Sequence, residues 1–207
     1  MTAYYYFGWR LVRTLFNILF GFRQEGLENI PADGPAIIAS NHQSNLDPPV
    51  VGTGIKRACH FFAKKELFDK FILGPVIVGF NSIPVRRGVY DPVSLERAVK
   101  ALREGGLLIM FPEGTRNDGK NFLPAKPGVG FIARQAEVPI VPAFVEGSRQ
   151  LGRAFRRKPP LSVTFGEPIT PEETDRFEND KNGHKQLACY VMEKIAEIRS
   201  RRSEDRD

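Results

Sequence analysis

The chain has 207 residues, of which 42% are hydrophobic and 26% charged, an ordinary composition for a folded protein of one domain with terminal extensions. Its net charge of +6 favours anionic partners, and because the basic residues are scattered, the pattern argues against a nucleic-acid-binding stripe. The histidines lack metal-ligand spacing, no GxGxxG or Walker A sequence occurs, and the two cysteines, Cys59 and Cys189, predict no disulfide framework. We therefore expect the protein to bind no metal, no cofactor and no nucleic acid. The expected partner is an anionic membrane surface or a phosphate-bearing substrate.

The N-terminal segment, residues 4–22, is rich in aromatic and aliphatic side chains. Arg10, Arg13, Thr14 and Asn17 recur at helical spacing, which predicts one polar face and a wide apolar face opposite. A membrane-spanning helix would carry both arginines into the bilayer, at roughly 2.5–3.5 kcal/mol each near its centre. The pattern favours an amphipathic helix at the membrane interface, with an ordinary core helix as the alternative. No basic region precedes the apolar run and no cleavage site follows it, which argues against a signal peptide.

Strands and helices alternate along the next part of the chain. Pro31 and Gly34 belong to a string of turn-forming residues, and Pro84 indicates the edge or end of a strand. In chain order we expect a strand within residues 21–30, a buried strand over residues 35–40, a strand over residues 60–63, a helix from about residue 65 to 71, and a strand over residues 82–85.

The segment from Asp91 to Gly105 carries the strongest helix signal. Asp91 is suited to the N-cap, Pro92 to the first helical position and Gly105 to the C-cap. The continuous apolar run that follows, residues 107–111, is typical of a strand buried on both faces.

The last third of the chain continues the alternation. Its expected elements are a helix over residues 127–136, strands over residues 140–145 and 161–165, a capped helix start at residues 170–173, and a helix over residues 181–202. Because strands alternate with helices throughout, the sequence predicts an α/β fold with a mixed, largely parallel sheet flanked by helices.

The turn after the strand of residues 35–40 carries candidate catalytic residues. The stretch Asn41 to Asp47 follows the buried strand of residues 35–40 and precedes two prolines, so His42 and Asp47 lie at a strand end, where α/β proteins place reactive groups. A turn can bring the Asp47 carboxylate to the His42 imidazole, which fixes the ring tautomer and stabilises the imidazolium. The pair then has the properties of a general base. The alternative is a helix-capping aspartate beside a surface histidine.

Four sequence blocks resemble those of the glycerolipid acyltransferases, in the same order. His42 to Asp47 resembles their H-x4-D signature, and Phe111 to Arg116 resembles their F-P-E-G-T-R block. Residues 63–68 with 83–88 resemble the second block, and residues 138–142 the fourth. The match is closest to the 1-acylglycerol-3-phosphate acyltransferases.

This resemblance implies transfer of a fatty acyl group from a thioester, either acyl-CoA or acyl-carrier protein, to the free hydroxyl of 1-acylglycerol 3-phosphate, giving phosphatidic acid for phospholipid biosynthesis. In that family the His-Asp dyad acts as general base without a covalent intermediate, and no G-x-S-x-G elbow supplies a serine nucleophile here. Residues 1–30 would form the membrane-anchor helix and its lead-in, and residues 31–207 the catalytic domain. Such a protein would be a monotopic membrane-associated enzyme at the cytoplasmic face.

The resemblance also assigns His42 and Asp47 to catalysis and six further residues to substrate binding. Arg116, Arg87 and Lys64 would meet the phosphate, although Arg86 beside Arg87 leaves that assignment open between the two arginines. Glu113 would orient Arg116 or a substrate hydroxyl, and Gly114 would allow close backbone approach. The six residues are Lys64, Arg87, Glu113, Gly114, Thr115 and Arg116.

Other functions remain open at this stage. An acyltransferase could act on another lysolipid or a related hydroxyl. A non-catalytic lipid-binding protein of the same fold would not need both His42 and Asp47. A thioesterase would use water as the acyl acceptor.

Overall fold

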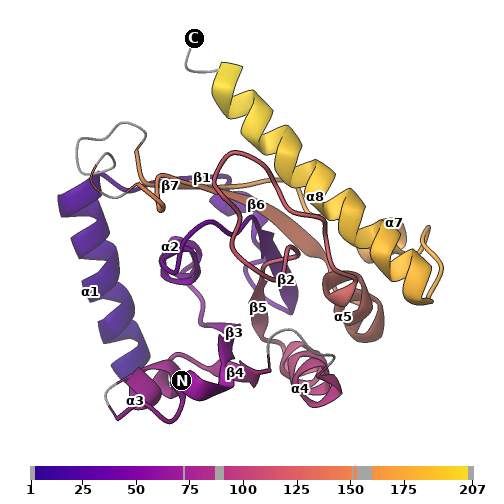
Figure 1. Ribbon diagram of the computed structural model, residues 1–207, viewed down its shortest axis with the longest axis horizontal. Coiled ribbons are helices and arrows are strands. Elements are labelled where there is room, and N and C mark those ends of the chain that lie inside the picture. Colours follow the sequence, from indigo (N-terminus) through magenta and orange to yellow (C-terminus); the bar gives the residue numbers. More distant parts are fainter. Residues whose placement is uncertain (1–2, 72, 87–90, 151, 153–159, 205–207) are drawn as a thin grey trace.

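The computed structural model describes residues 3–71, 73–86, 91–150, 152 and 160–204. Within this described part of the chain, one seven-stranded sheet lies between two groups of helices (Figure 1). The strands are β1 (Arg23–Glu25), β2 (Ala36–Ser40), β3 (Cys59–Lys64), β4 (Ser82–Val85), β5 (Leu107–Met110), β6 (Ile140–Glu146) and β7 (Ser162–Phe165).

The sheet is mixed and largely parallel, as the sequence predicts. Its strand order is β1-β7-β6-β2-β5-β3-β4. The five strands from β6 to β4 are parallel, whereas β7 runs antiparallel to β6 and pairs in parallel with β1. Strand β4, with Pro84, lies at the sheet edge, where a missing ladder hydrogen bond is tolerated.

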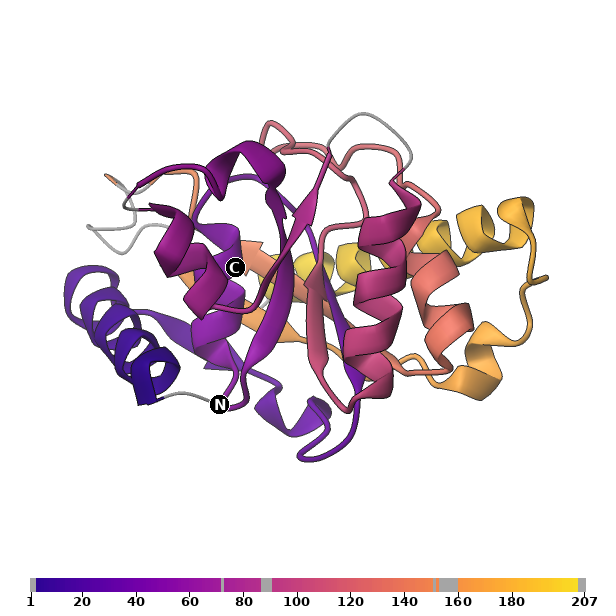
Figure 2. The same ribbon diagram turned by 90° about the horizontal axis from the view of Figure 1, so that it is seen from below.

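Helices cover both faces of the sheet (Figures 1 and 2). On one face lie α1 and α2, and on the other α4, α5 and α8. The α-helices are α1 (Ala3–Phe20), α2 (Asp47–Gly54), α3 (Leu73–Gly79), α4 (Pro92–Arg103), α5 (Gly128–Ala136), α7 (Pro171–Thr174) and α8 (Lys181–Glu204), and the 3₁₀ helices are η1 (Leu27–Asn29) and η2 (Lys65–Leu67).

Strand β2 shows how one apolar run serves two hydrophobic cores. Successive side chains of a strand point to opposite faces. Ile37 and Ala39 pack in the core with α4, α5 and α8, while Ala36 and Ile38 pack in the core with α1 and α2. All four are fully buried. The strand that precedes the His-Asp turn is thus rigidly packed in the middle of the sheet.

The caps predicted for α4 and α7 are confirmed. The Asp91 side chain accepts a hydrogen bond from the backbone N–H of Ser94, and Gly105 has φ +86 just beyond the end of α4. Thr170 and Glu173 form the reciprocal capping box at the start of α7.

The helix predicted from about residue 65 to 71 is wrong. Only the 3₁₀ turn η2 forms there, with backbone bonds from Phe68 N to Lys65 O and from Lys70 N to Leu67 O, and the next α-helix begins at Leu73. The chain folds back so closely here that a Cβ on Gly74 would overlap the Phe68 carbonyl oxygen. This reversal ends the helical turn that the local pattern favours.

Helix α1 docks on α2 through Trp9 and Arg13, although the sequence pattern assigns Arg13 to the polar face of the helix. Trp9 Nε1 donates to the carbonyls of Gly52 (3.1 Å) and Ile55 (2.8 Å), and Arg13 Nη1 donates to that of Thr53 (3.1 Å). These bonds satisfy carbonyls at and just beyond the C-terminus of α2, the end at which a cation is favourable. Arg13, predicted to lie on the polar face, therefore faces α2. Its guanidinium lies over the Trp9 ring, 5.0 Å from the ring centroid.

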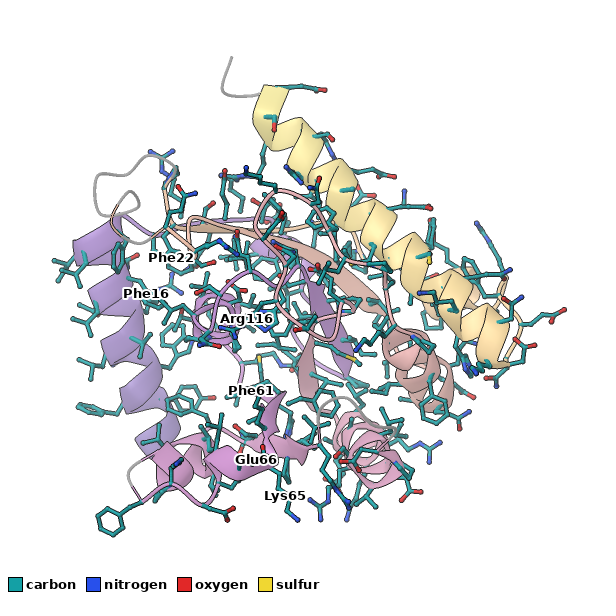
Figure 3. All side chains as sticks on the ribbon, in the orientation of Figure 1. Phe16, Phe22, Phe61, Lys65, Glu66 and Arg116 are labelled. Carbon is teal, nitrogen blue, oxygen red and sulfur yellow. The ribbon has the colours of Figure 1, made fainter. Side chains whose placement is uncertain are left out.

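The C-terminal end of α1 contributes to the same core. The Phe16 and Phe22 rings lie edge to face with centroids 5.8 Å apart, and both side chains are buried (Figure 3). In the described part of the chain, no helix combines the length and apolar character needed to cross a membrane.

Candidate active site

The His-Asp turn lies at the carboxyl edge of the parallel strands. β2 ends at Ser40, and Asp47 is the first residue of α2. The neighbouring strand β5 ends at Met110 and leads into the loop of residues 111–127 at the same edge. Open α/β sheets place ligand sites in this position.

His42 and Asp47 form a buried hydrogen-bonded pair. Nδ1 of His42 lies 2.8 Å from Oδ2 of Asp47, and the two residues are 4% and 0% exposed. The same Oδ2 accepts hydrogen bonds from the backbone N–H groups of Gln43 (2.6 Å) and Ser44 (2.7 Å). With the carboxylate facing Nδ1, that nitrogen carries the proton and Nε2 is left to accept one. The spacing-based prediction that the turn joins the two groups is confirmed, and the surface-histidine alternative is wrong.

The His42 ring is held from a second direction by Phe111. The two rings stack with centroids 4.2 Å apart and an interplanar angle of 20°. Among the described residues, His42 is the one histidine in an ion pair with a carboxylate. His184 instead hydrogen-bonds Asn179, and burial lowers the pKa values of both His184 and His60.

Glu113 connects the two loops of the site. It is buried, and its carboxylate accepts from the backbone N–H of His42 (2.8 Å), the backbone N–H of Leu123 (2.7 Å) and the side-chain amide of Asn117 (2.9 Å to each oxygen). Asn117 N in turn donates to the His42 carbonyl at 2.7 Å. Both Glu113 oxygens are thus engaged by the protein. This bracing of the His42 backbone differs from the two roles weighed from the sequence, and substrate binding by Glu113 stays a prediction.

Gly114 lies in a tight turn that brings Lys126 beside it. Gly114 has φ +68, and its N–H donates to the Phe111 carbonyl at 2.9 Å. A Cβ at this position would lie 2.7 Å from Cδ of Lys126, so a residue with a side chain would displace the lysine. Sequence reasoning missed Lys126, because a lone lysine ten positions beyond the end of the motif carries no local signal.

A cavity of about 270 Å³ opens beside the His42 ring. Its walls are mainly apolar, and Arg86 and Lys126 place two cations at its border. A hydrocarbon group in this cavity would lie next to the imidazole. The apolar side chains lining it are Phe62, Val85, Leu95, Ile109, Met110, Phe111 and Pro112.

The remaining predicted binding residues lie at the surface of the same edge. Lys64 is the last residue of β3 and is exposed, as are Thr115 and Arg116 in the loop after β5. Arg87 lies outside the described residues, whereas Arg86 is described and exposed. The structure therefore brings His42, Asp47 and Glu113 into one hydrogen-bonded assembly, with Gly114 in the turn beside it, and leaves the side chains of Lys64, Arg86 and Arg116 exposed to water.

Comparisons with known proteins show which family the chain and its fold resemble. A family model described as Acyltransferase matches residues 21–146. The 1-acyl-sn-glycerol-3-phosphate acyltransferase of Bacillus subtilis (strain 168) is 31% identical over 76% of this chain and 78% of its own length. The mouse 1-acyl-sn-glycerol-3-phosphate acyltransferase alpha is 34% identical over 83% of this chain and 65% of its own. The crystal structure of the 1-acyl-sn-glycerophosphate (LPA) acyltransferase PlsC from Thermotoga maritima superposes with a TM-score of 0.70 and 27% identity, covering 94% of this chain and 79% of that one.

Proposed function

The chain belongs to the acyltransferase family, and we propose that it transfers a fatty acyl group from an acyl thioester to the free hydroxyl of 1-acylglycerol 3-phosphate, giving phosphatidic acid. The observation that carries the proposal is the buried His42–Asp47 pair beside an apolar cavity. The names of the relatives support this choice of acceptor.

His42 acts as the general base. Its Nε2 takes the proton from the acceptor hydroxyl as the hydroxyl oxygen attacks the thioester carbonyl carbon. Asp47 stabilises the imidazolium that forms. The C–S bond breaks, and the leaving thiolate receives the proton from His42. We assign no covalent intermediate to the reaction, because a thioester has a good leaving group and the hydroxyl can attack it directly. Ser44 Oγ accepts a hydrogen bond from the Leu46 backbone N–H at 3.2 Å, which is consistent with a turn residue.

The apolar acyl chain and the charged phosphate of the substrates fit different parts of the site. The cavity beside His42 suits an acyl chain, whose burial contributes about 0.8 kcal/mol per methylene. The exposed cations Lys64, Arg86 and Arg116 suit the acceptor phosphate, with Arg87 as a further candidate outside the described residues. The acyl donor is acyl-CoA or acyl-carrier protein.

An acyl-transfer assay over a matrix of donors and acceptors tests this function. Labelled acyl-CoA and acyl-carrier protein are each incubated with lysophosphatidic acid, other lysolipids and no acceptor. We expect phosphatidic acid from lysophosphatidic acid with at least one donor. No product with either donor would favour a lipid-binding protein, a better acceptor would redirect the assignment, and equally fast release of free fatty acid without acceptor would indicate a thioesterase.

We also propose that α1 attaches the enzyme to a membrane surface as a monotopic protein. Its inward residues pack on α2, yet its outward face carries large apolar side chains, with Phe7 71% and Ile18 69% exposed. Such a face can enter the boundary between headgroups and acyl chains. The outward stripe follows helical spacing and consists of Phe7, Leu11, Leu15 and Ile18.

Vesicle sedimentation tests the attachment. The triple variant Phe7→Gln, Leu11→Gln, Ile18→Gln removes outward apolar groups and leaves the contacts of Trp9 and Arg13 in place. We expect it to lose most binding to anionic vesicles while keeping the wild-type melting temperature. Val93→Gln, which changes an exposed apolar residue on α4, is the control and should bind normally. Undiminished binding of the triple variant would refute the role of this face.

A further inference from the structure

A buried serine from a distant part of the chain contacts the catalytic carboxylate. Ser148 Oγ donates a hydrogen bond to Oδ1 of Asp47 at 2.5 Å, although the two residues are 101 positions apart in the chain. Ser148 is 1% exposed. It lies just beyond residues 21–146, which the acyltransferase family model matches.

We infer that Ser148 is a positioning residue for the reaction, the third member of a His42–Asp47–Ser148 chain of hydrogen bonds. This inference rests on the proposed function, since it concerns the dyad that carries the acyl transfer. Ser148 does not touch the substrate or exchange its proton. It holds the Asp47 carboxylate in the orientation in which that group fixes the His42 ring.

The hydrogen bonds of Asp47 show why a donor is needed on this side. Oδ2 has three partners, namely the His42 ring and the backbone N–H groups of Gln43 and Ser44. Oδ1 receives the Ser148 hydroxyl. A buried carboxylate oxygen without a donor is costly, and the carboxylate would relieve that cost by rotating. Rotation would move Oδ2 off the line to His42 Nδ1, so the serine opposes the motion that misaligns the base.

Ser148 is positioned by hydrogen bonds that join the His42 turn to the end of β6. The Asn41 side chain binds Val145 by two hydrogen bonds, from Val145 N to Oδ1 (2.7 Å) and from Nδ2 to Val145 O (3.0 Å). Gln43 Nε2 donates to the same Val145 carbonyl at 2.9 Å. The residues on either side of His42 are thus tied to the strand end that carries Ser148.

The turn after β6 then directs the serine inward. Gly147 has φ +80, and a Cβ there would lie 2.5 Å from the Pro160 carbonyl oxygen, so the position requires glycine. On the other side, Arg149 Nη1 donates to the Asn117 carbonyl at 2.8 Å. Asn117 is also bound to Glu113, so the segment of Ser148 is anchored to both loops of the site.

The chemistry of a hydroxyl suits the role. It is a neutral donor, so it satisfies Oδ1 without cancelling the carboxylate charge on which the imidazolium depends. A lysine or arginine in this place would neutralise that charge. Ser148 therefore fixes the geometry of Asp47 and leaves its electrostatic contribution to His42 intact.

Kinetics of Ser148→Ala with a matched control test the inference. The control is Ser162→Ala, which removes the hydroxyl of a serine that is also 1% exposed but lies on β7, where Arg202 donates to it at 3.3 Å. We expect Ser148→Ala to lower kcat about 10- to 150-fold, the range that corresponds to one hydrogen bond to a charged group. KM for the acceptor should stay within about twofold in both variants, and kcat of Ser162→Ala should stay near wild type. Wild-type kcat in folded Ser148→Ala would overturn the inference.

A spectroscopic measurement separates this inference from the proposed function. The proton on His42 Nδ1 gives an NMR resonance that reports its hydrogen bond to Asp47, and it is assigned by its loss in His42→Gln. The resonance should move or broaden in Ser148→Ala and remain in place in Ser162→Ala. If the wild-type protein makes no phosphatidic acid, the proposed function fails, while this comparison still decides whether Ser148 positions Asp47.

A second variant covers the case in which Ser148→Ala does not fold. Ser148→Cys keeps a side chain of similar shape whose thiol is a weaker donor. A folded Ser148→Cys enzyme should show a displaced His42 resonance and a kcat below wild type. An unchanged resonance and an unchanged kcat in this variant would overturn the inference.

Discussion

The candidate active site has two regions, one buried and one exposed, whose side chains are held in place differently. The inner region, His42, Asp47 and Glu113, is buried and hydrogen-bonded within the protein. The outer region, with Lys64 and Arg116, is exposed, and within the described part of the chain neither cation forms an ion pair. In the buried region each hydrogen bond is strong and each missing partner costly, whereas water and salt weaken the field of the exposed cations. The comparison shows that the protein itself orients His42. It also predicts that the exposed Lys64 and Arg116 take fixed positions only when they bind the phosphate of the proposed acceptor.

The largest effect should follow from His42→Ala. Removing the base should lower kcat by about 10²- to 10⁴-fold, the usual contribution of general base catalysis. The buried, Phe111-stacked ring also leaves a cavity, so we expect a lower melting temperature with a folded protein. His184→Ala, which changes a histidine on α8 that hydrogen-bonds Asn179, is the control and should retain activity. Retention of most wild-type kcat by His42→Ala would exclude the general-base role.

Asp47→Asn should be nearly as severe. An asparagine has one acceptor oxygen, and its amide nitrogen would face either the donors on Oδ2 or the Ser148 hydroxyl. We expect kcat to fall by about 10²-fold or more, because the ring meets the wrong partner. Steady-state kinetics together with thermal melting separate this loss from unfolding. A folded variant with kcat within about tenfold of wild type would mean that the carboxylate is not part of the base.

Arg116→Ala tests the outer region. Loss of one charge-assisted bond to phosphate corresponds to about a 10- to 150-fold fall in kcat/KM for lysophosphatidic acid. An uncharged monoacylglycerol acceptor, if it is used at all, should be affected far less, and the melting temperature should not change. Equal losses with both acceptors would place Arg116 with the structural residues of the inner region.

Glu113→Gln should have a smaller effect on turnover and a clear effect on stability. The glutamine amide nitrogen replaces one carboxylate oxygen, so either the His42 N–H on Oε1 or the Leu123 N–H on Oε2 loses its acceptor. We expect a loss of about 1–3 kcal/mol in the free energy of unfolding, measured by denaturant titration, and about a tenfold fall in kcat. Wild-type stability together with a raised KM would instead support substrate binding by Glu113.

The smallest effect should come from salt. Raising ionic strength shortens the Debye length from about 10 Å at 0.1 M to about 3 Å at 1 M, which screens exposed charges but not the buried pair. With a micellar short-chain acceptor, KM should rise severalfold and kcat should change little. A fall in kcat with constant KM would contradict the separation of the two regions.

The sequence predicts those parts of the protein that depend on neighbouring residues. The strand before His42, the caps of α4 and α7, and the five-residue spacing from His42 to Asp47 all follow from local conformational preferences, and the structure agrees with them. The alternation of strands and helices likewise suffices for a mixed, largely parallel sheet.

Tertiary structure alone decides the partners that come from distant segments. Ser148 reaches Asp47 across 101 positions, Glu113 reaches His42 across 71, and Arg13 leaves its polar face to bind Thr53 across 40. A serine after a strand or an arginine on an amphipathic helix has the same local pattern whether it meets water or a buried carboxylate or carbonyl. Such partners are fixed by the packing of β6 beside β2 and of α1 on α2, because a hydrogen bond depends on distance in space and not on separation in the chain.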